Sequence, residues 1–451
     1  ADLTGANLAL AKLSETQLDD TTRIDAKYRL VYDILNQGAA GRDLSNADLS
    51  AAYLANADLS NSKLIHTDLR GSDLTGANLF MADLKDTIID DSTLIDPKYR
   101  LAWELTNQGA ADLDLNNADL SGTNLSAADF SHFDLRTVQI DESTHIDPKW
   151  SLVWQIVNHG AVNQDLSSAD LSCADLRDAA FAGANLIDAD LSGSDLSGAD
   201  FTDADLALAD LRGAIIDDST QIDDKHRLAW EIVNQGAAGR DLGATDLSGS
   251  SLTGTDLHGS DLSLTNLSSA LLAEADLGGA NLYGADLRDA CLAGADLNGA
   301  DLAKADLRGT LLDETTLIED KWHLVWEIVN QGTPGRDLEG VDLGRANLQD
   351  ADLRDANLKL ADLSGADLSG ADLTNADLGW ADLTEAQLSE GTRIDTRYRL
   401  VWEILNQGAA GRDLSNADLS AAYLANADLS NSKLVHTDQR GSDLTGANLI
   451  M

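Results

Sequence analysis

Apolar residues recur every five positions along most of this chain. One run starts at Leu44 and ends at Ile89, with mostly small and polar residues between the apolar ones. Equivalent runs cover residues 3–18, 115–140, 166–216, 242–312, 338–388 and 414–449, which gives 65 repeats in all. A period of five fits neither the 3.6-residue turn of a helix nor the two-residue alternation of a strand. The pattern therefore predicts a chain that turns a corner in every repeat and returns its apolar residue to a common axis.

The composition of each repeat supports this interpretation. A typical repeat is Ala-Asp-Leu-Ser-Gly, as in residues 361–365. The small residue two positions before the leucine would share the interior with it, because residues two apart on an extended segment face the same side. The Asp or Asn directly before the leucine can accept hydrogen bonds from nearby backbone at the corner. Stacked turns would then bury a continuous leucine column, which is a solenoid stabilised by contacts between neighbouring turns.

These A(D/N)LXX repeats resemble the pentapeptide-repeat family. The resemblance implies an all-β solenoid, a right-handed quadrilateral β-helix with four repeats per coil, and it covers nearly the whole chain outside six short insertions. We therefore expect residues 1–451 to form a single continuous pentapeptide-repeat solenoid. Phe130, Phe181 and Phe201 at central positions fit the family, whereas Gln439 does not. Burying its amide would cost about 1–3 kcal/mol unless it is paired; alternatively, Gln439 marks a degenerate coil.

Six insertions interrupt the repeats, each at the same phase. They cover about 24–41, 95–112, 146–163, 222–239, 318–335 and 394–411. In each, the opening isoleucine lies six positions after the last apolar centre, and the next leucine centre lies four repeat lengths further on, as in Ile24 to Leu44. We predict a short α-helix in each insertion, with proline at the first helical position in Pro97 and Pro148 and a stop at glycines such as Gly38. The expected N-caps are Asp25, Asp96, Asp147, Asp223 and Asp395.

The inserted helices are rich in aromatic and basic residues. Apolar side chains would cover roughly 200° of the first helix, more than a helix lying on a surface needs. Seven of the eight tryptophans lie in the insertions. We therefore take the aromatic residues as candidate assembly contacts. They are Tyr28, Tyr32, Tyr99, Trp103, Trp150, Trp154, Trp230, Trp322, Trp326, Tyr398 and Trp402. The alternative is that each helix folds flat onto its own coils and covers a break in them.

A longer repeat is superimposed on the five-residue one. Residues 34–81 match residues 404–451 with three changes, at Ile65, Leu69 and Phe80. The first and last insertions open in the same register, at Ile24 and Ile394. This predicts a 370-residue superunit that recurs near residue 371 in a longer tandem array, and both ends of the sequence lie in mid-run. An isolated terminal duplication is the alternative.

Composition and scattered chemistry exclude several classes of function. The net charge of −46 argues against direct binding of nucleic acid or an anionic membrane surface. No apolar run is long enough for a membrane span, and two cysteines cannot form a disulfide framework. The eight histidines are isolated and show no metal-ligand spacing. We predict no catalytic residues, no cofactor and no metal site. Weak Ca²⁺ or Mg²⁺ binding by stacked aspartates is an alternative to a solvated acidic face.

Two functions from different classes fit these features. The first is a non-enzymatic structural or scaffold protein that forms a segment of a long shaft or filament. Its inserted helices would mediate end-to-end or lateral self-association. An adaptor for other proteins fits the same pattern. The second follows from the resemblance, because some members of the family mimic DNA and bind DNA gyrase. Along stacked coils the net charge of −46 gives about one charge per 2 Å, close to duplex DNA. The insertions also resemble segments of cyanobacterial pentapeptide-repeat proteins, which implies a cyanobacterial source.

Overall fold

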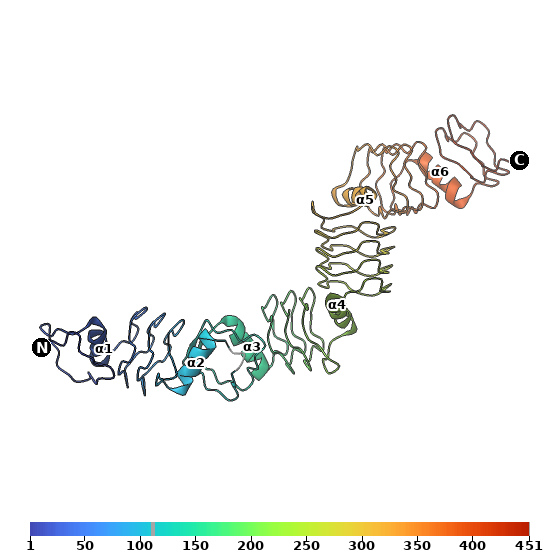
Figure 1. Ribbon diagram of the computed structural model, residues 1–451. Coiled ribbons are helices and arrows are strands. Elements are labelled where there is room, and N and C mark those ends of the chain that lie inside the picture. The colour runs from blue at the N-terminus through green and yellow to red at the C-terminus, as the bar shows by residue number, and fades with distance from the viewer. Residues whose placement is uncertain (110–112, 451) are drawn as a thin grey trace. The chain divides into compact units, whose positions relative to one another are not determined.

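The computed structural model describes residues 1–109 and 113–450 (Figure 1). The chain forms two compact units. The first unit comprises Ala1–Asp205 and Gly213–Ile222, and the second comprises Leu206–Arg212 and Asp223–Met451. The first unit contains helices α1 (Ala26–Gln37), α2 (Pro97–Asn107) and α3 (Pro148–His159), with strands β1 (Asn124–Leu125) and β2 (His145–Ile146). The second contains α4 (Asp224–Gln235), α5 (Asp320–Gln331) and α6 (Thr396–Gln407).

Successive coils in each unit pair in parallel, with a spacing of four repeats. Asp43 pairs with Lys63, and Asp48 pairs with Asp68. The Leu44 N–H donates to the Lys63 carbonyl at 2.9 Å, and the Lys63 N–H donates to the Arg42 carbonyl at 3.0 Å. Each leucine therefore lies over the equivalent leucine of the next coil. Most pairs involve one residue from each coil; among the described residues only β1 and β2 form a two-residue parallel ladder.

The aspartate before each leucine stabilises the corner that follows it. Asp43 Oδ1 accepts the Ser45 N–H at 3.0 Å, and the Ala47 N–H donates to the Leu44 carbonyl at 3.1 Å. Asn46, between these donors, has a φ of 63°, in the left-handed region that asparagine and glycine tolerate best. The predicted role of Asp and Asn at the corner is confirmed.

Central leucines form the core of each unit. Leu49, Leu54 and Leu59 in the first unit are fully buried, as are Leu363 and Leu368 in the second. Two of the central phenylalanines stack face to face: the ring centroids of Phe181 and Phe201 are 4.9 Å apart. Gln439 departs from the pattern as expected, because its side-chain nitrogen is buried and has no hydrogen-bond partner among the described residues.

All six predicted helices are present, and each takes the place of two repeats. After α1 the Ala39 N–H donates to the Asp58 carbonyl at 2.9 Å, so Ala39 occupies a central position and is fully buried. The step from Ile24 to Ala39 equals three repeat lengths, and α1 replaces the two centres between them. Val31 and Ile34 of α1 enter the core in their place, with 1% exposure each. This substitution explains why the chain returns in phase at Leu44.

The same inward pairs occur in the other five helices. They are Ala102 and Leu105, Val153 and Ile156, Ala229 and Ile232, Val325 and Ile328, and Val401 and Ile404, all buried. The last residues of the second insertion, 110–112, lie outside the described residues. Within the described part of the chain, every helix is too short and too polar to cross a lipid bilayer.

Candidate functional site

The N-termini of the inserted helices follow the predicted capping in four cases. The side chains of Asp96, Asp147, Asp223 and Asp395 accept the N–H of Lys98, Lys149, His226 and Arg397, at 2.8–2.9 Å. Asp25 also lies at the N-cap position of α1, as predicted, but its side chain makes no capping hydrogen bond. Its carboxylate accepts the Gly5 N–H at 3.2 Å instead, so it holds the preceding coil.

Basic residues in the first turn attach each helix to the coil that follows it. The ammonium groups of Lys27, Lys149 and Lys321 each lie 2.8 Å from an aspartate of that coil, Asp48, Asp170 and Asp342 respectively. Partial burial opposes ionisation of Asp48, but hydrogen bonds from Lys27 and Ser50 outweigh it and lower its pKa to about 2. These basic residues of the insertions therefore form their ion pairs within the chain itself.

An asparagine near the end of each helix attaches it to the coil that precedes it. Asn406 Nδ2 donates to the Leu383 carbonyl and to the Trp402 carbonyl, both at 2.9 Å. The equivalent bonds to a leucine carbonyl come from Asn36, Asn107, Asn158, Asn234 and Asn330, at 2.9–3.1 Å. Sequence reasoning missed these residues, although an asparagine two positions before the terminating glycine in every insertion was a visible signal.

The candidate aromatic residues lie against the coils. Four tryptophans donate their indole N–H to the backbone carbonyl of a residue in the preceding coil, at 2.6–2.9 Å: Trp103, Trp154, Trp326 and Trp402. Trp150, Trp322 and Tyr398, in the first turns, are 6–8% exposed. The remaining candidates, Tyr28, Tyr32, Tyr99 and Trp230, are half-buried. The helices thus lie flat on their own coils, and a partner would reach only the outer edges of these side chains.

Large exposed apolar side chains occur on the coils instead. Examples are Phe80 and Leu94 in the first unit and Leu264, Leu311 and Leu360 in the second, which are 40–62% exposed. Within the described ranges, no large exposed apolar side chain belongs to a helix.

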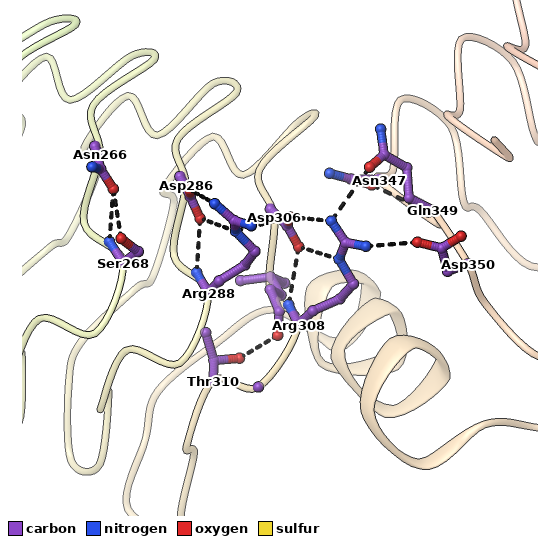
Figure 2. Close-up of polar contacts among 12 residues, drawn as sticks. Asn266, Ser268, Asp286, Arg288, Asp306, Arg308, Thr310, Asn347, Gln349 and Asp350 are labelled. Carbon is purple, nitrogen blue, oxygen red and sulfur yellow. Dashed lines mark hydrogen bonds and ion pairs between the residues drawn. The ribbon is translucent and has the colours of Figure 1, made fainter. Parts of the chain in front are cut away.

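The acidic surface is partly neutralised by arginines of the same repeats. In the second unit Arg288 pairs with Asp286, and Arg308 pairs with Asp306 (Figure 2). Arg308 also reaches past the α5 insertion, where its Nη1 lies 2.9 Å from Asp350 Oδ2. Arg136 makes the equivalent contact at α3, 3.2 Å from Asp178. These pairs reduce the number of carboxylates that are free to imitate phosphates.

The groups that could perform chemistry are dispersed. No group of three or more His, Cys, Asp or Glu side chains that could hold a metal ion occurs among residues 1–109 and 113–450. Cys173 and Cys291 are free thiols, one in each unit.

Comparison with known proteins identifies the repeats. The family model described as Pentapeptide repeats (8 copies) matches more than half of the chain. The matched residues are 43–79, 111–138, 165–198, 179–218, 238–268, 260–299, 290–319, 337–375, 361–391 and 413–449. No curated protein matches the sequence.

Several solved structures of such proteins are similar to this chain. HetL, a pentapeptide-repeat protein involved in regulating heterocyst differentiation in the cyanobacterium Nostoc sp. strain PCC 7120, is 26% identical; the match covers 64% of this chain and 90% of HetL, with a TM-score of 0.16. A thylakoid-lumen protein of Arabidopsis thaliana is 24% identical, over 37% of this chain and 77% of that protein, with a TM-score of 0.11. QnrB1, a plasmid-mediated fluoroquinolone resistance protein, is 18% identical, over 60% and 91%, with a TM-score of 0.15.

Proposed function

This chain belongs to the pentapeptide-repeat family, and on that premise we propose that it is a non-enzymatic structural scaffold. Membership implies a right-handed β-helical solenoid, and the return after four repeats supports four sides per coil. The observation that carries the proposal is the construction of the inserted helices. Each replaces two repeats, buries at least two residues in the core, and is bonded at its end to the preceding coil. Such helices are held at fixed places on a regular support, as a scaffold requires.

The scaffold is proposed to be one continuous solenoid over residues 1–451 and a segment of a longer tandem array. The 370-residue recurrence supports this in structural terms. The pairs Asp43–Lys63 and Asp48–Asp68 recur as Asp413–Lys433 and Asp418–Asp438. Two segments of one chain that fold with the same register favour an array built from repeated superunits, as in a shaft or filament.

Assembly is proposed to involve the outer edges of the helices. All six helices carry a half-buried leucine at the same position. They are Leu30, Leu101, Leu152, Leu228, Leu324 and Leu400. Together with the half-buried aromatic residues they leave an apolar edge that a second copy could cover. Burial of such edges would stabilise self-association by the hydrophobic effect.

Sedimentation over a range of protein concentrations tests this proposal. We expect the average mass of the full chain to rise with concentration. Replacing Leu228, Leu324 and Leu400 by serine should weaken association, whereas Leu264→Ser should not, because Leu264 is 62% exposed and lies outside the helices. Circular dichroism would verify that both variants remain folded. A constant monomer mass at all concentrations would reject self-association, and loss of association in Leu264→Ser alone would move the contact to the coils.

A second candidate is a DNA mimic that binds DNA gyrase or a related topoisomerase. The observation that favours it is the stacking of aspartates in successive coils, such as Asp342 with Asp362 and Asp362 with Asp382. Columns of carboxylates on one side of a coil stack resemble a line of phosphates in charge. A supercoiling assay with gyrase, with and without a fluoroquinolone, decides the matter: neither inhibition nor protection at saturating protein would eliminate this candidate.

A further inference from the structure

Three tyrosines lie outside the inserted helices: Tyr53, Tyr283 and Tyr423. A basic group of the same unit lies over two of these rings. Lys12 Nζ is 5.1 Å from the ring centroid of Tyr53, and Arg345 Cζ is 5.4 Å from that of Tyr283. Within the described part of the chain, Tyr423 has no such cation. The difference matters because Tyr53 and Tyr423 occupy equivalent places in the 370-residue recurrence.

The equivalence extends to the coils around the two tyrosines. The Leu10 N–H donates to the Ala51 carbonyl at 2.8 Å in the first unit. The Trp380 N–H donates to the Ala421 carbonyl at 2.8 Å in the second. In both units this bond joins the coil before a helix to the coil after it. The backbone therefore places the residue two positions after each donor alongside the equivalent tyrosine.

That residue is Lys12 in the first unit and Asp382 in the second. The first unit thus supplies its own ammonium to Tyr53. The second unit supplies a carboxylate at the same place, so the cation is removed and a negative charge is added. The Lys12–Tyr53 contact shows that this backbone arrangement accommodates an ammonium group over the ring.

A hollow of about 360 Å³ lies beside Tyr423. Its lining includes Leu360, Asp362, Trp380, Asp382, Tyr423 and Asp443, and no basic side chain of the described residues. Arg345 lines the adjoining hollow, but its guanidinium lies over Tyr283. We call the first of these the Tyr423 hollow.

The walls of the Tyr423 hollow are fixed in position. Trp380 Nε1 donates to the Gly441 carbonyl at 2.6 Å, which holds the indole in place while 37% of the side chain stays exposed. The three aspartates each accept a backbone N–H through Oδ1, from Ser364, Thr384 and Thr445, at 2.8–2.9 Å. No protein donor to their Oδ2 atoms occurs in the described ranges. Burial raises the pKa of Tyr423, and so do the charges of Asp382, Asp443 and Asp362, which places its phenol in the field of all three carboxylates.

We propose that the Tyr423 hollow binds a lysine side chain of a partner polypeptide. An ammonium group gains from the faces of aromatic rings and from charge-assisted hydrogen bonds to carboxylates, and the hollow offers both. The aliphatic part of a lysine would lie along Leu360 and Trp380, as lysine stems commonly do on apolar surface. The net charge of −46 would attract a basic partner from a distance. This proposal stands independently of self-association.

The test uses the full chain and the peptide acetyl-Gly-Lys-Gly-amide, whose lysine signals are followed by NMR line broadening. We expect saturable binding, and no binding of the same peptide acetylated on the lysine nitrogen. Asp382→Lys should weaken binding at least ~10-fold, because it restores the internal cation of the first unit. Trp380→Leu should weaken it without changing the charge.

The matched control is Asp256→Lys, which changes the net charge equally at an exposed aspartate elsewhere in the second unit. It should leave peptide binding almost unchanged. Equal weakening by Asp256→Lys and Asp382→Lys would overturn the proposal, because it would reveal diffuse attraction to the acidic surface. Equal binding of the acetylated peptide would also overturn it.

Discussion

Arg308 Nη1 donates to Asp350 Oδ2 at 2.9 Å, and so joins the coil before α5 to the coil after it (Figure 2). The same guanidinium contacts Asp306 in its own repeat and Gln349 in the following coil. The Lys304 N–H also donates to the Arg345 carbonyl at 2.8 Å across the same insertion, and Arg308 adds side-chain contacts beside that backbone bond.

Removing the guanidinium should therefore destabilise the second unit. Arg308→Ala is expected to lower the free energy of unfolding by about 1 kcal/mol, since the pair is charge-assisted but partly exposed. Arg354→Ala is the matched control, because within the described ranges Arg354 pairs only with Asp352 of its own repeat. Chemical denaturation should show a smaller loss for Arg354→Ala. Equal losses would mean that the contact to Asp350 contributes nothing.

The asparagine near the end of each helix should be more important for stability. Asn406→Asp removes the Nδ2 donor and places a carboxylate against the carbonyls of Leu383 and Trp402. Because two acceptors lose their donor and a charge is added beside them, we expect a loss of about 2 kcal/mol or more in the free energy of unfolding. Gln407→Glu adds the same charge at the next, exposed residue and should change stability by less than ~0.5 kcal/mol. Urea denaturation of both variants measures the difference.

Local features of the repeats could be predicted from sequence, and tertiary ones could not. The leucine column, the aspartates at corners and the six helices each leave a periodic or capping signal. The central position of Ala39 left no such signal in the sequence, because an alanine there resembles the many alanines that lie two positions before a leucine. Its role becomes clear only from its bond to Asp58, which also shows that a helix replaces two repeats.

The burial of the inserted helices also could not be predicted from the sequence. A wide apolar arc indicates contact, but it does not say whether two coils of the same chain or a partner provide it. Trp322 and Tyr398 are buried because the coils before and after each helix cover it from two sides. The Tyr423 hollow likewise depends on residues such as Leu360 and Asp443, which are distant in sequence.

Gln439 offers a test of the core with an internal template. Its equivalent in the first unit is Leu69, which is fully buried. Gln439→Leu removes a buried amide nitrogen that has no partner among the described residues, and should raise the free energy of unfolding by about 1–2 kcal/mol. The reciprocal Leu69→Gln should lower it by at least as much. Thermal unfolding of the two variants tests whether Gln439→Leu stabilises the protein and Leu69→Gln destabilises it. Destabilisation by Gln439→Leu would contradict the conclusion that the Gln439 amide nitrogen is buried without a partner.

The ion pair of Lys27 and Asp48 predicts a specific dependence on pH. Hydrogen bonds from Lys27 and Ser50 prevail over burial and lower the pKa of Asp48 from 3.8 to about 2. Because the folded-state pKa lies below the unfolded one, ionised Asp48 stabilises the fold above pH ~4, and this contribution is lost as the pH falls towards ~2. Asp48→Asn should therefore lower the melting temperature at neutral pH and match the wild type near pH ~2. Lys27→Met should show the same trend, and a difference that grows in acid would contradict the ion pair.

Each insertion returns the chain to the five-residue register of the repeats. We therefore predict that a whole inserted helix can be deleted while the repeats stay in register. Leu388 and Leu414 are the centres on either side of α6. Deleting residues 389–409 would leave them five positions apart, joined by the segment 410–413, which is the ordinary repeat length. Gly411 already has a φ of 73°, as the corner after a centre requires. Trp380 and Ala421 would then lie four repeats apart, which is the usual spacing between paired residues of neighbouring coils.

We therefore expect the chain without residues 389–409 to fold, with less helical signal in circular dichroism and a melting temperature close to that of the wild type. Deleting only residues 389–406 removes α6 almost completely but leaves the two centres eight positions apart. The leucines after the junction could then enter the core only through a strained loop. Each buried leucine lost from the core would lower the free energy of unfolding by about 2–5 kcal/mol. Comparable melting of the two deletions would show that the helix does not stand in for two repeats of a coil.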